Sequence, residues 1–369
     1  MAQKKSKSKK AQSKNAKIQF GGQNPTSQDV ANLANVSRAT VSYVLNNTPG
    51  IKITEETKKQ VLDAAAQLGY IPNHLASSLR SGQNNLVILP FFNWPYNQGS
   101  IAFLQELAAR LDLLGYTVLL RFLRENNKEN FIRKIGSFHP SGIIFYSETI
   151  SQADADLLTR NGVQSLLFFG QSSNSDIPAI WQDFSDIGRC VGNYLVNKGY
   201  KHIAAVVPKD NRILKMGLER FNGLKQVCEE NNVKLERIDL DYDKEEAIKI
   251  TKLWKKNPKP DAIFTYNDEY GMMLLSALRD SDLSVPSDIA LVGCDDLPLC
   301  EMLSPCLTSV RFSHTSPADS IATYFDSLLR GKEVETPLQI PIECEIIERE
   351  SSCFDYTAKK NPGRDTNPG

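Results

Sequence analysis

The stretch TSQDVANLANVSRATVSYVLNN, residues 26–47, predicts two short helices joined by a tight turn. Thr26 and Asp29 form a capping-box-like helix start, with a side-chain oxygen free to accept from the first-turn N–H groups. Asn35 stands where a left-handed turn residue is needed, and Ser37 is an N-cap for the second helix. The inner faces are expected to hold apolar residues, namely Val30, Leu33, Ala34, Val36, Val41, Val44 and Leu45. This spacing is typical of a helix–turn–helix.

The second helix of such a motif lies in the major groove of DNA, and its first residues contact base edges. Arg38 would offer a two-pronged donor to guanine, and Ala39 an apolar contact to a thymine methyl group. An ordinary helical hairpin with a polar outer face is the alternative interpretation of this stretch alone.

Two further segments extend the pattern. TEETKKQVLDAAAQL, residues 54–68, predicts a third helix with an N-cap, acidic residues in its first turn and a glycine, Gly69, at its end. Its apolar positions are Val61, Leu62, Ala65 and Leu68. The segment YIPNHLASSLRSG, residues 70–82, predicts a short helix that starts at Pro72 and stops at Gly82.

The motifs DVANLANVSRATVSYVLNN and GYIPNHLASSLRSG resemble the DNA-binding head and hinge of the lactose-repressor/galactose-repressor (LacI/GalR) family of bacterial transcription regulators. The resemblance runs from about Thr26 to Ser352; it is highly specific in the head and hinge and looser downstream. It implies a head at 26–70, a hinge helix at 71–83 and DNA contacts by Thr26, Ser37, Arg38, Ala39, Thr40, Ser42, Tyr43, Asn46, Tyr70, Asn73, His74, Ala76 and Leu79.

The hinge has a role of its own in that family. There it folds on DNA and pushes a leucine into the minor groove, and the matching residue here is Leu79, with Ala76 as the small residue beside it. Apolar wedges of this kind unstack a base step and kink the duplex. A simple interdomain linker is the alternative. Tyr43 replaces an arginine often found after the recognition-helix serine, so the operator need not be the common one.

Charge is distributed unevenly along the chain. Residues 1–25 hold seven lysines and no acidic residue, which predicts a disordered basic tail that either attracts DNA or only solubilises the chain. By count from the sequence, residues 1–83 carry twelve Lys/Arg and four Asp/Glu, a net of +8, and the remainder a net of −8. A basic head on an acidic body fits a protein that binds DNA at one end.

The remaining composition narrows the class of protein. A chain of 369 residues can hold two or three domains. No apolar run reaches the roughly eighteen residues of a membrane span, and the tail lacks a secretory signal. Seven cysteines without a CxxC pair argue against disulfides and a zinc site, and fit a reducing cytoplasm.

From residue 85 onward, short apolar runs alternate with segments of helical periodicity, which predicts an α/β fold. The expected strands are 86–92, 116–122, 142–147, 165–170, 202–208, 262–267 and 289–294, and the expected helices include 101–114, 186–198, 213–230, 244–256 and 270–280. The resemblance implies that this body, residues 84–356, is two Rossmann-like lobes similar to a type I periplasmic sugar-binding protein. Lobe one would take 85–183 and 315–341, lobe two 184–314 and 342–356, and a tail 357–369.

A small-molecule effector is expected between the lobes, because ligands of open α/β sheets bind at the carboxyl ends of strands. After the first strand, Trp94 and Tyr96 would stack on a sugar and Asn97 would bond its hydroxyls. By motif, the further candidates are Asp183, Phe184, Arg220, Tyr242, Asn267 and Asp295, each with a strand-end cap or surface residue as the alternative. Gly170 and Gln171 stand where many sugar-responsive members have an aspartate, which leaves the particular sugar open.

Other classes of function fit less well. The sequence has no P-loop, GxGxxG, HExxH or GxSxG motif, so no enzyme and no cofactor are predicted. A solute-binding protein would have no use for the head. The prediction is a cytoplasmic repressor that binds a pseudo-palindromic operator as a dimer, possibly a tetramer, under control of a sugar. Control by a partner protein or a non-sugar ligand is the alternative.

Overall fold

The computed structural model describes residues 25–45, 50–71, 85–92, 98–123, 128–146, 150–170, 177–255, 259–312 and 315–353. The chain divides into two compact units, Met1–Gly82 and Gln83–Gly369, called here the head and the body. Several predictions lie outside the described residues: both tails apart from Pro25, nearly the whole hinge, and the contacts assigned to Asn46, Asn73, His74, Ala76, Leu79, Trp94, Tyr96, Asn97 and Gln171.

In its described part, the head consists of helices α1 (Ser27–Leu33), α2 (Arg38–Leu45) and α3 (Glu55–Leu68). The capping box at the start of α1 is present, with the Thr26 and Asp29 side chains each accepting from the other's backbone N–H. Asn35 has a φ of 52°, and Gly69 ends α3 in the left-handed conformation. The predicted helices, caps and turn are therefore confirmed.

Two predicted core positions of the head are wrong. Leu33 is 46% exposed and Leu62 is 52% exposed. In α1 the buried residues are Val30 and Ala31, so Leu33 lies at the edge of the buried face of the helix. In α3 the stripe of i, i+3, i+4 and i+7 positions runs through Val61, Ala64, Ala65 and Leu68, and Leu62 falls outside it.

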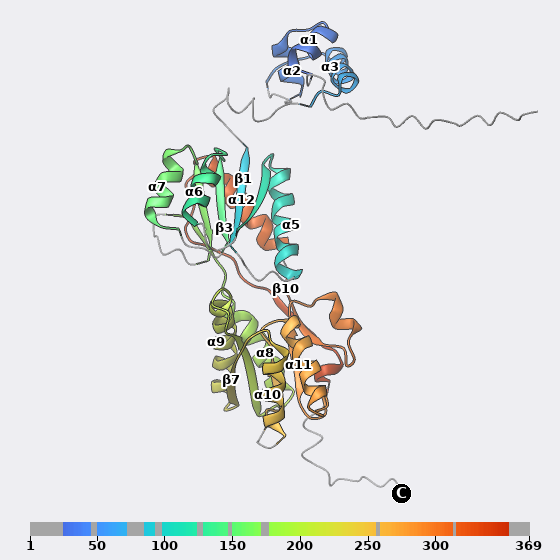
Figure 1. The fold of residues 1–369 in the computed structure, drawn as a ribbon, viewed down its shortest axis with the longest axis vertical. Helices are drawn as coiled ribbons and strands as arrows, with labels where there is room; N and C mark the ends of the chain where they lie inside the picture. Colours follow the sequence, from blue (N-terminus) through green and yellow to red (C-terminus); the bar gives the residue numbers. More distant parts are fainter. Residues whose placement is uncertain are drawn as a thin grey trace, which may run out of the picture. The chain divides into compact units, whose positions relative to one another are not determined.

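The body contains two six-stranded sheets, each covered by helices on both faces (Figure 1). The first sheet is parallel and has the order β11-β5-β4-β3-β1-β2, with strands β1 (Leu86–Phe92), β2 (Thr117–Leu123), β3 (Gly142–Tyr146), β4 (Ser165–Phe169), β5 (Ala179–Trp181) and β11 (Leu338–Gln339). One apolar core lies under α5 (Gln98–Leu113) and α12 (Thr315–Leu329), and another under α6 (Lys128–Gly136) and α7 (Gln152–Arg160).

The second sheet has the order β12-β10-β9-β8-β6-β7. Its strands are β6 (His202–Pro208), β7 (Lys234–Leu240), β8 (Ala262–Phe264), β9 (Ala290–Cys294), β10 (Thr308–Phe312) and β12 (Cys344–Ile347). Helices α8 (Ser185–Asn197) and α9 (Leu214–Glu230) cover one face, and α10 (Lys244–Trp254) and α11 (Asp268–Asp280) the other. Short 3-10 helices lie at Pro298–Met302 and Glu350–Ser352.

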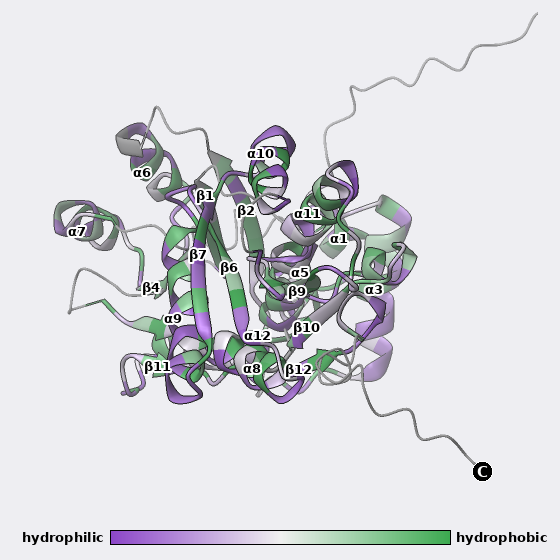
Figure 2. Cartoon of the chain, turned by 90° about the horizontal axis from the view of Figure 1, so that it is seen from below, coloured by the Kyte–Doolittle hydropathy of each residue, from purple (hydrophilic) through white to green (hydrophobic). Residues whose placement is uncertain are grey.

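The predicted α/β class with two mostly parallel sheets is confirmed. Every residue of β9 is buried, as expected of a central strand covered on both faces. Two strands depart from the expected pattern. Strand β7 alternates polar and apolar residues because it is an edge strand with one exposed face, and this alternation is visible in Figure 2. Strand β12 runs antiparallel to β10.

The chain passes from one sheet to the other at three places. It leaves the first sheet after β5, returns to it between β10 and α12, and leaves it again after β11. Two of these crossover segments, residues 182–184 and 340–343, are described. Lobe one and lobe two below mean the first and the second sheet with their helices. Among the described helices, none is long and apolar enough to cross a bilayer.

Candidate functional site

The exposed surface of α2 carries the residues expected to face DNA. Arg38, Ala39, Ser42 and Tyr43 are exposed there. The Arg38 Nε donates to the Ser27 hydroxyl at 2.9 Å, which fixes the base of its side chain against α1. This bond uses Nε, whereas the two terminal nitrogens form the fork that can bind a base edge.

Four other residues assigned to DNA contact also have structural partners in the head. The Ser37 hydroxyl accepts from the backbone N–H of Thr40 at 3.0 Å, and the two hydroxyls lie 2.8 Å apart. Thr26 is the N-cap of α1. Tyr70 is partly buried against the apolar core of the head. These side chains stabilise the helix–turn–helix whatever contacts they make with DNA.

The body contains a cavity of about 600 Å³ that both lobes line. Lobe one contributes Gly99, Ser100 and Phe103 from the start of α5, Phe169 from the end of β4, and Pro317 and Ser320 from α12. Lobe two contributes strand ends, α9 and α11, and both described crossover segments add residues. The cavity is therefore built at the carboxyl ends of parallel strands, where open α/β sheets bind ligands.

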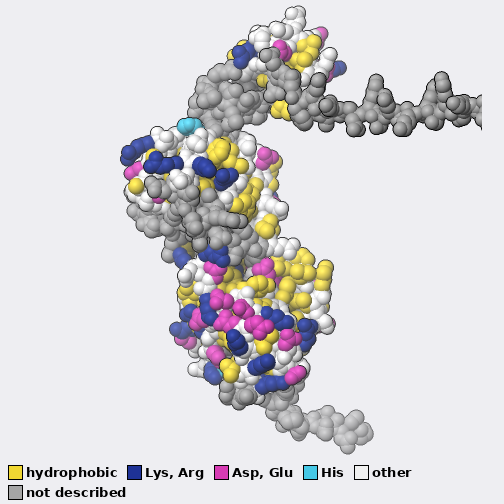
Figure 3. Space-filling view, viewed as in Figure 1, with side chains coloured by type: hydrophobic (Ala, Val, Ile, Leu, Met, Phe, Trp, Pro, Cys, Tyr) yellow, Lys and Arg dark blue, Asp and Glu magenta, His cyan; other side chains and the backbone are white. Residues whose placement is uncertain are grey.

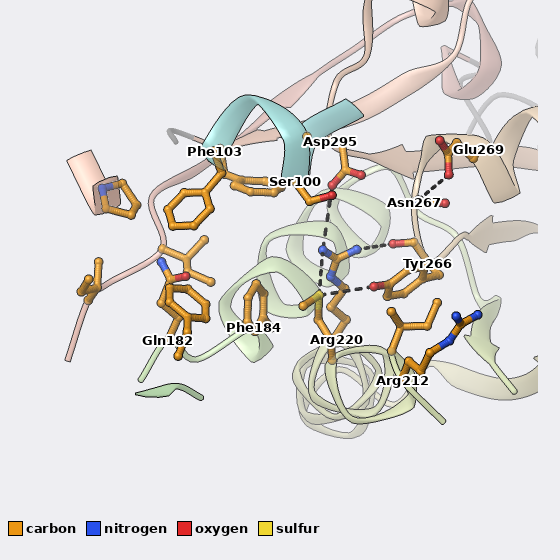
Figure 4. A pocket seen from close by; sticks show the side chains of 18 of the residues that line it. Ser100, Phe103, Gln182, Phe184, Arg212, Arg220, Tyr266, Asn267, Glu269 and Asp295 are labelled. Atoms are coloured by element: carbon orange, nitrogen blue, oxygen red, sulfur yellow. Dashed lines mark hydrogen bonds and ion pairs between the residues drawn. The ribbon is translucent and has the colours of Figure 1, made fainter. Parts of the chain in front are cut away.

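Arg220 of α9 lies at the centre of the lobe-two wall (Figure 4). Its side chain is 5% exposed, and its Nη1 donates to the Tyr266 carbonyl oxygen. The guanidinium lies 4.7 Å from the centroid of the Tyr266 ring, within the range of a cation–π contact. Its buried Nε has no hydrogen-bond partner among the described groups. Buried polar groups without partners are rare, which marks Arg220 as a group that a ligand can satisfy.

The Asp295 Oδ1 lies 3.9 Å from the Arg220 Nη2, and the Asp295 side chain is 3% exposed. Burial raises the pKa of Asp295 to about 7; the charge of Arg220 opposes this rise, and Asp268 and Glu269 add to it. The pair is long for a buried salt bridge, and the Arg220 Nε keeps bonding capacity that a ligand can use. The next residue, Asp296, is turned away and binds Arg311 and Arg349.

Asp268, the neighbour of Asn267, stabilises the part of lobe two that lines the cavity. It is fully buried and accepts from the Ser309 hydroxyl at 2.6 Å and from the Leu297 N–H at 2.8 Å. Burial raises its pKa to about 6, although these hydrogen bonds oppose the rise. Asp268 thus holds the loop after β9, which carries Asp295, against α11.

Of the described candidates for the effector site, five line the cavity: Phe184, Arg220, Tyr242, Asn267 and Asp295. Asn267 also caps α11, with its Oδ1 accepting from the Tyr270 N–H at 3.1 Å. Tyr242 is 63% exposed at the rim, where its ring lies 5.3 Å from that of Tyr270. Asp183 is not among the lining residues, and it instead caps α8 at Ser185 and pairs with Arg189.

The cavity also contains residues that the sequence did not single out. They include Ser100, Phe103, Gln182, Asp210, Arg212, Met216, Asp241, Tyr266, Glu269, Tyr270, Phe312 and residues 338–343. Tyr266 precedes Asn267 at a strand end, so its position was a usable signal. Phe103 lies on a helix, and residues 338–343 lie on β11 and the crossover after it, so only the assembled fold brings them to the cavity. Among the described residues, no cluster of His, Cys, Asp or Glu has the arrangement of a metal site.

Two family models match the chain. Residues 26–73 match the bacterial regulatory proteins of the lacI family, and residues 193–352 match the periplasmic binding protein-like domain. The first covers the helix–turn–helix and the second most of lobe two with the Arg220 wall of the cavity.

Similar proteins match most of the chain. Catabolite control protein A of Priestia megaterium is 28% identical over 299 residues, which cover 78% of this chain and 87% of that protein. The HTH-type transcriptional repressor PurR of Photobacterium profundum is 26% identical over 295 residues, which cover 78% of this chain and 86% of that protein.

Solved structures show the same fold. The lac repressor dimer bound to operator and the anti-inducer ONPF has a TM-score of 0.72 at 23% identity, covering 89% of this chain and 99% of that one. The complex of the transcriptional regulator CelR with cellobiose has a TM-score of 0.62 at 23% identity, and the match covers 89% of this chain and 100% of that one. The relatives are transcriptional regulators and not enzymes. With its helix–turn–helix head and its two-lobed effector-binding body, this chain belongs to the lacI family of bacterial regulatory proteins, as a DNA-binding transcriptional regulator.

Proposed function

We propose that this regulator is a repressor in the cytoplasm that binds a pseudo-palindromic operator as a dimer, and that a neutral sugar in the cavity controls its affinity for DNA. The observation that carries the proposal is the Arg220–Asp295 pair, which is buried, long and turned to a cavity of about 600 Å³. A ligand with several hydroxyl groups would accept from the Arg220 Nε, and its hydroxyls are suited to donate to a carboxylate such as that of Asp295.

Charge favours a neutral ligand over a phosphorylated one. Five carboxylates line the described cavity, from Asp210, Asp241, Glu269, Asp295 and Glu343, against the two arginines Arg212 and Arg220. Each arginine already has an acidic partner, because Arg212 binds Asp210 and Arg220 faces Asp295. A phosphate would meet an excess of negative charge. On the face of the molecule that Figure 3 shows, acidic side chains gather on lobe two.

A sugar site also needs aromatic side chains beside its polar groups, and the cavity contains them. Phe103 of lobe one lines the cavity, and Phe184 of the crossover lies beside Arg220, whose guanidinium is 5.9 Å from the centroid of its ring (Figure 4). The apolar face of a pyranose would stack on such rings while its hydroxyls reach the polar groups. CelR, whose fold is similar, was solved with cellobiose, which agrees with this choice of ligand.

Apolar side chains on the outside of the body favour self-association. Leu113 of α5 is 79% exposed, Phe122 of the edge strand β2 is 60% exposed, and Met302 is 76% exposed. Contiguous patches of such residues, rather than single ones, mark surfaces that partners cover. Two-fold symmetry of the protein would then match two half-sites in the operator.

A thermal-shift screen of the full chain tests the effector. The probes are glucose, cellobiose, glucose 6-phosphate and nucleosides. A neutral sugar at about a hundred times its dissociation constant is expected to stabilise the body by about 2.7 kcal/mol, with no shift from the phosphate. A shift from glucose 6-phosphate or a nucleoside alone, or from no probe, would contradict the sugar assignment.

Arg38→Ala tests base readout by the head. We expect the variant to lose its preference at one base pair of each half-site, at a cost of about 1–3 kcal/mol, because the guanidinium fork is removed. Random-site selection followed by sequencing measures this preference. Ser27→Ala is the matched control, since it removes the 2.9 Å bond to Nε and keeps the fork. An unchanged selection profile for Arg38→Ala would exclude Arg38 from base readout.

A further inference from the structure

Two cysteines on lobe two lie against each other although they are 154 residues apart in the sequence. Cys190 is on α8, and Cys344 is the first residue of β12. The Cys190 Sγ is 3.9 Å from the Cys344 carbonyl oxygen, and the Cys344 Sγ is 3.7 Å from the Asp186 carbonyl oxygen in the first turn of α8. Each thiol therefore lies close to the segment that carries the other, and the two sulfurs are neighbours in the fold.

The environment of the pair gives the two thiols different roles. Both residues are partly exposed. A hydrogen bond between the thiols lowers the pKa of Cys190 and raises the pKa of Cys344. The thiolate is the reactive form of cysteine, so Cys190 is the nucleophile and Cys344 the thiol that resolves its oxidised form.

The other five cysteines lack this combination. Cys228, Cys294 and Cys300 are buried. The Cys306 thiol donates to the carbonyl oxygens of Glu301 and Leu303. Partial burial and the neighbouring Glu348 carboxylate raise the pKa of Cys353. A mild oxidant should therefore react first at Cys190.

The pair is placed where two crossover segments enter lobe two. Helix α8 follows residues 182–184, and β12 follows residues 340–343; both segments contribute residues to the cavity wall. Helix α8 is also in backbone contact with α9, which carries Arg220: a Cβ at Gly188 would overlap the Arg220 carbonyl oxygen. A covalent bond between α8 and β12 would therefore restrain the ends of both crossover segments in lobe two.

We propose that Cys190 and Cys344 form a reversible disulfide on oxidation by a peroxide, and that this bond fastens the two crossover segments to each other. The Cys190 thiolate attacks one oxygen of hydrogen peroxide, the O–O bond breaks, and hydroxide leaves. The resulting sulfenic acid is attacked by the Cys344 sulfur, which forms the S–S bond and releases water after proton transfer. Two thiols are oxidised and one peroxide is reduced to two waters; a dithiol reverses the change.

The test uses the full chain, treated with limiting hydrogen peroxide, alkylated and digested without reductant. Mass spectrometry is expected to find the Cys190 peptide linked to the Cys344 peptide, and the link is expected to disappear with dithiothreitol. Cys344→Ser should instead leave Cys190 as a sulfenic acid that dimedone traps. Cys306→Ser is the control and should form the link as the unchanged chain does. A link between other cysteines, or dimedone labelling of Cys353 ahead of Cys190, would overturn the proposal.

Hydrogen exchange tests the consequence for the crossovers without any effector, so its result is separate from that of the sugar assignment. In the oxidised chain, the amides of 182–184 and of Ile340, Ile342 and Glu343 are expected to exchange roughly tenfold more slowly than in the reduced chain. The peroxide-treated Cys344→Ser variant should show no such slowing. A confirmed link with unchanged exchange in both segments would refute the fastening of the crossovers.

Discussion

Gly223→Ala is expected to lower the free energy of unfolding of the body by about 3 kcal/mol, because the added methyl group has no room. Gly223 is in α9, and a Cβ there would fall far inside the contact distance of the Ser185 carbonyl oxygen in α8. The neighbour is backbone at the start of a helix, so it cannot move aside as the end of a side chain would. The gain of about 1 kcal/mol in helix propensity from alanine is too small to offset this overlap.

Gly188 of α8 likewise lies in close contact with the backbone of α9. A Cβ at Gly188 would overlap the carbonyl oxygen of Arg220 and approach the backbone nitrogen of Leu224. Gly188→Ala is therefore expected to destabilise the body to a similar extent. Because the overlap is with Arg220 itself, this variant should also move the guanidinium and weaken any ligand that binds it.

Urea unfolding followed by circular dichroism measures both variants. Gly136→Ala in α6 is the matched control, since a Cβ there would meet the Leu158 side chain at an ordinary 3.5 Å. Its unfolding midpoint should stay close to that of the unchanged chain. Midpoints for Gly188→Ala and Gly223→Ala equal to the control would show that α8 and α9 are not in close backbone contact.

Arg220→Gln is expected to weaken the response to the effector strongly and to destabilise the body in a pH-dependent way. A charge-assisted hydrogen bond contributes about 1.5–3 kcal/mol, so ligand affinity should fall by roughly tenfold to a hundredfold. At pH 8, loss of the partner of a buried carboxylate is expected to cost about 3 kcal/mol of stability.

The sign of the pH dependence follows from Asp295. Burial raises its pKa in the folded protein to about 7 from the ordinary 3.8, so ionisation of Asp295 reduces stability as the pH rises through this window. Without the opposing charge of Arg220, the pKa of Asp295 rises further. The stability difference between the unchanged chain and Arg220→Gln is therefore expected to be smaller at pH 5, where Asp295 is protonated in both, and larger at pH 8.

Urea unfolding at the two pH values and the thermal-shift response to cellobiose measure these effects. Arg212→Gln is the control, because Arg212 lines the same cavity but is 36% exposed and pairs with Asp210. It should change stability by less than about 1 kcal/mol at either pH. An Arg220→Gln protein with equal losses at pH 5 and pH 8 would contradict coupling between Arg220 and Asp295.

Local features of the head were predictable because their causes lie within a few residues. The cap at Thr26, the left-handed turn at Asn35 and the end of α3 at Gly69 all depend on hydrogen bonds or backbone angles of near neighbours. The errors at Leu33 and Leu62 have a different cause. Which flank of an apolar stripe is buried depends on the direction from which another helix approaches, and the stripe itself does not contain that information.

In the body, the apolar runs predicted seven strands, and each coincides with a strand of the structure. Strand β7, KLERIDL, was not predicted because an edge strand buries one face and lacks a continuous apolar run. The division into two lobes was inferred from the resemblance, since spacing along the chain does not say which strands pair with which.

The sequence by itself determined the helix–turn–helix, the α/β class and the family, because caps, periodicity and motifs act over short distances. The resemblance to the family also marked Arg220, through the motif ERFNG, and Asp295, through a motif at a strand end. Only the tertiary structure decided that Phe103 and residues 338–343 join the cavity wall. It alone placed Cys190 beside Cys344. These contacts join residues far apart in the chain, and they exist only after two sheets have formed and exchanged crossover segments.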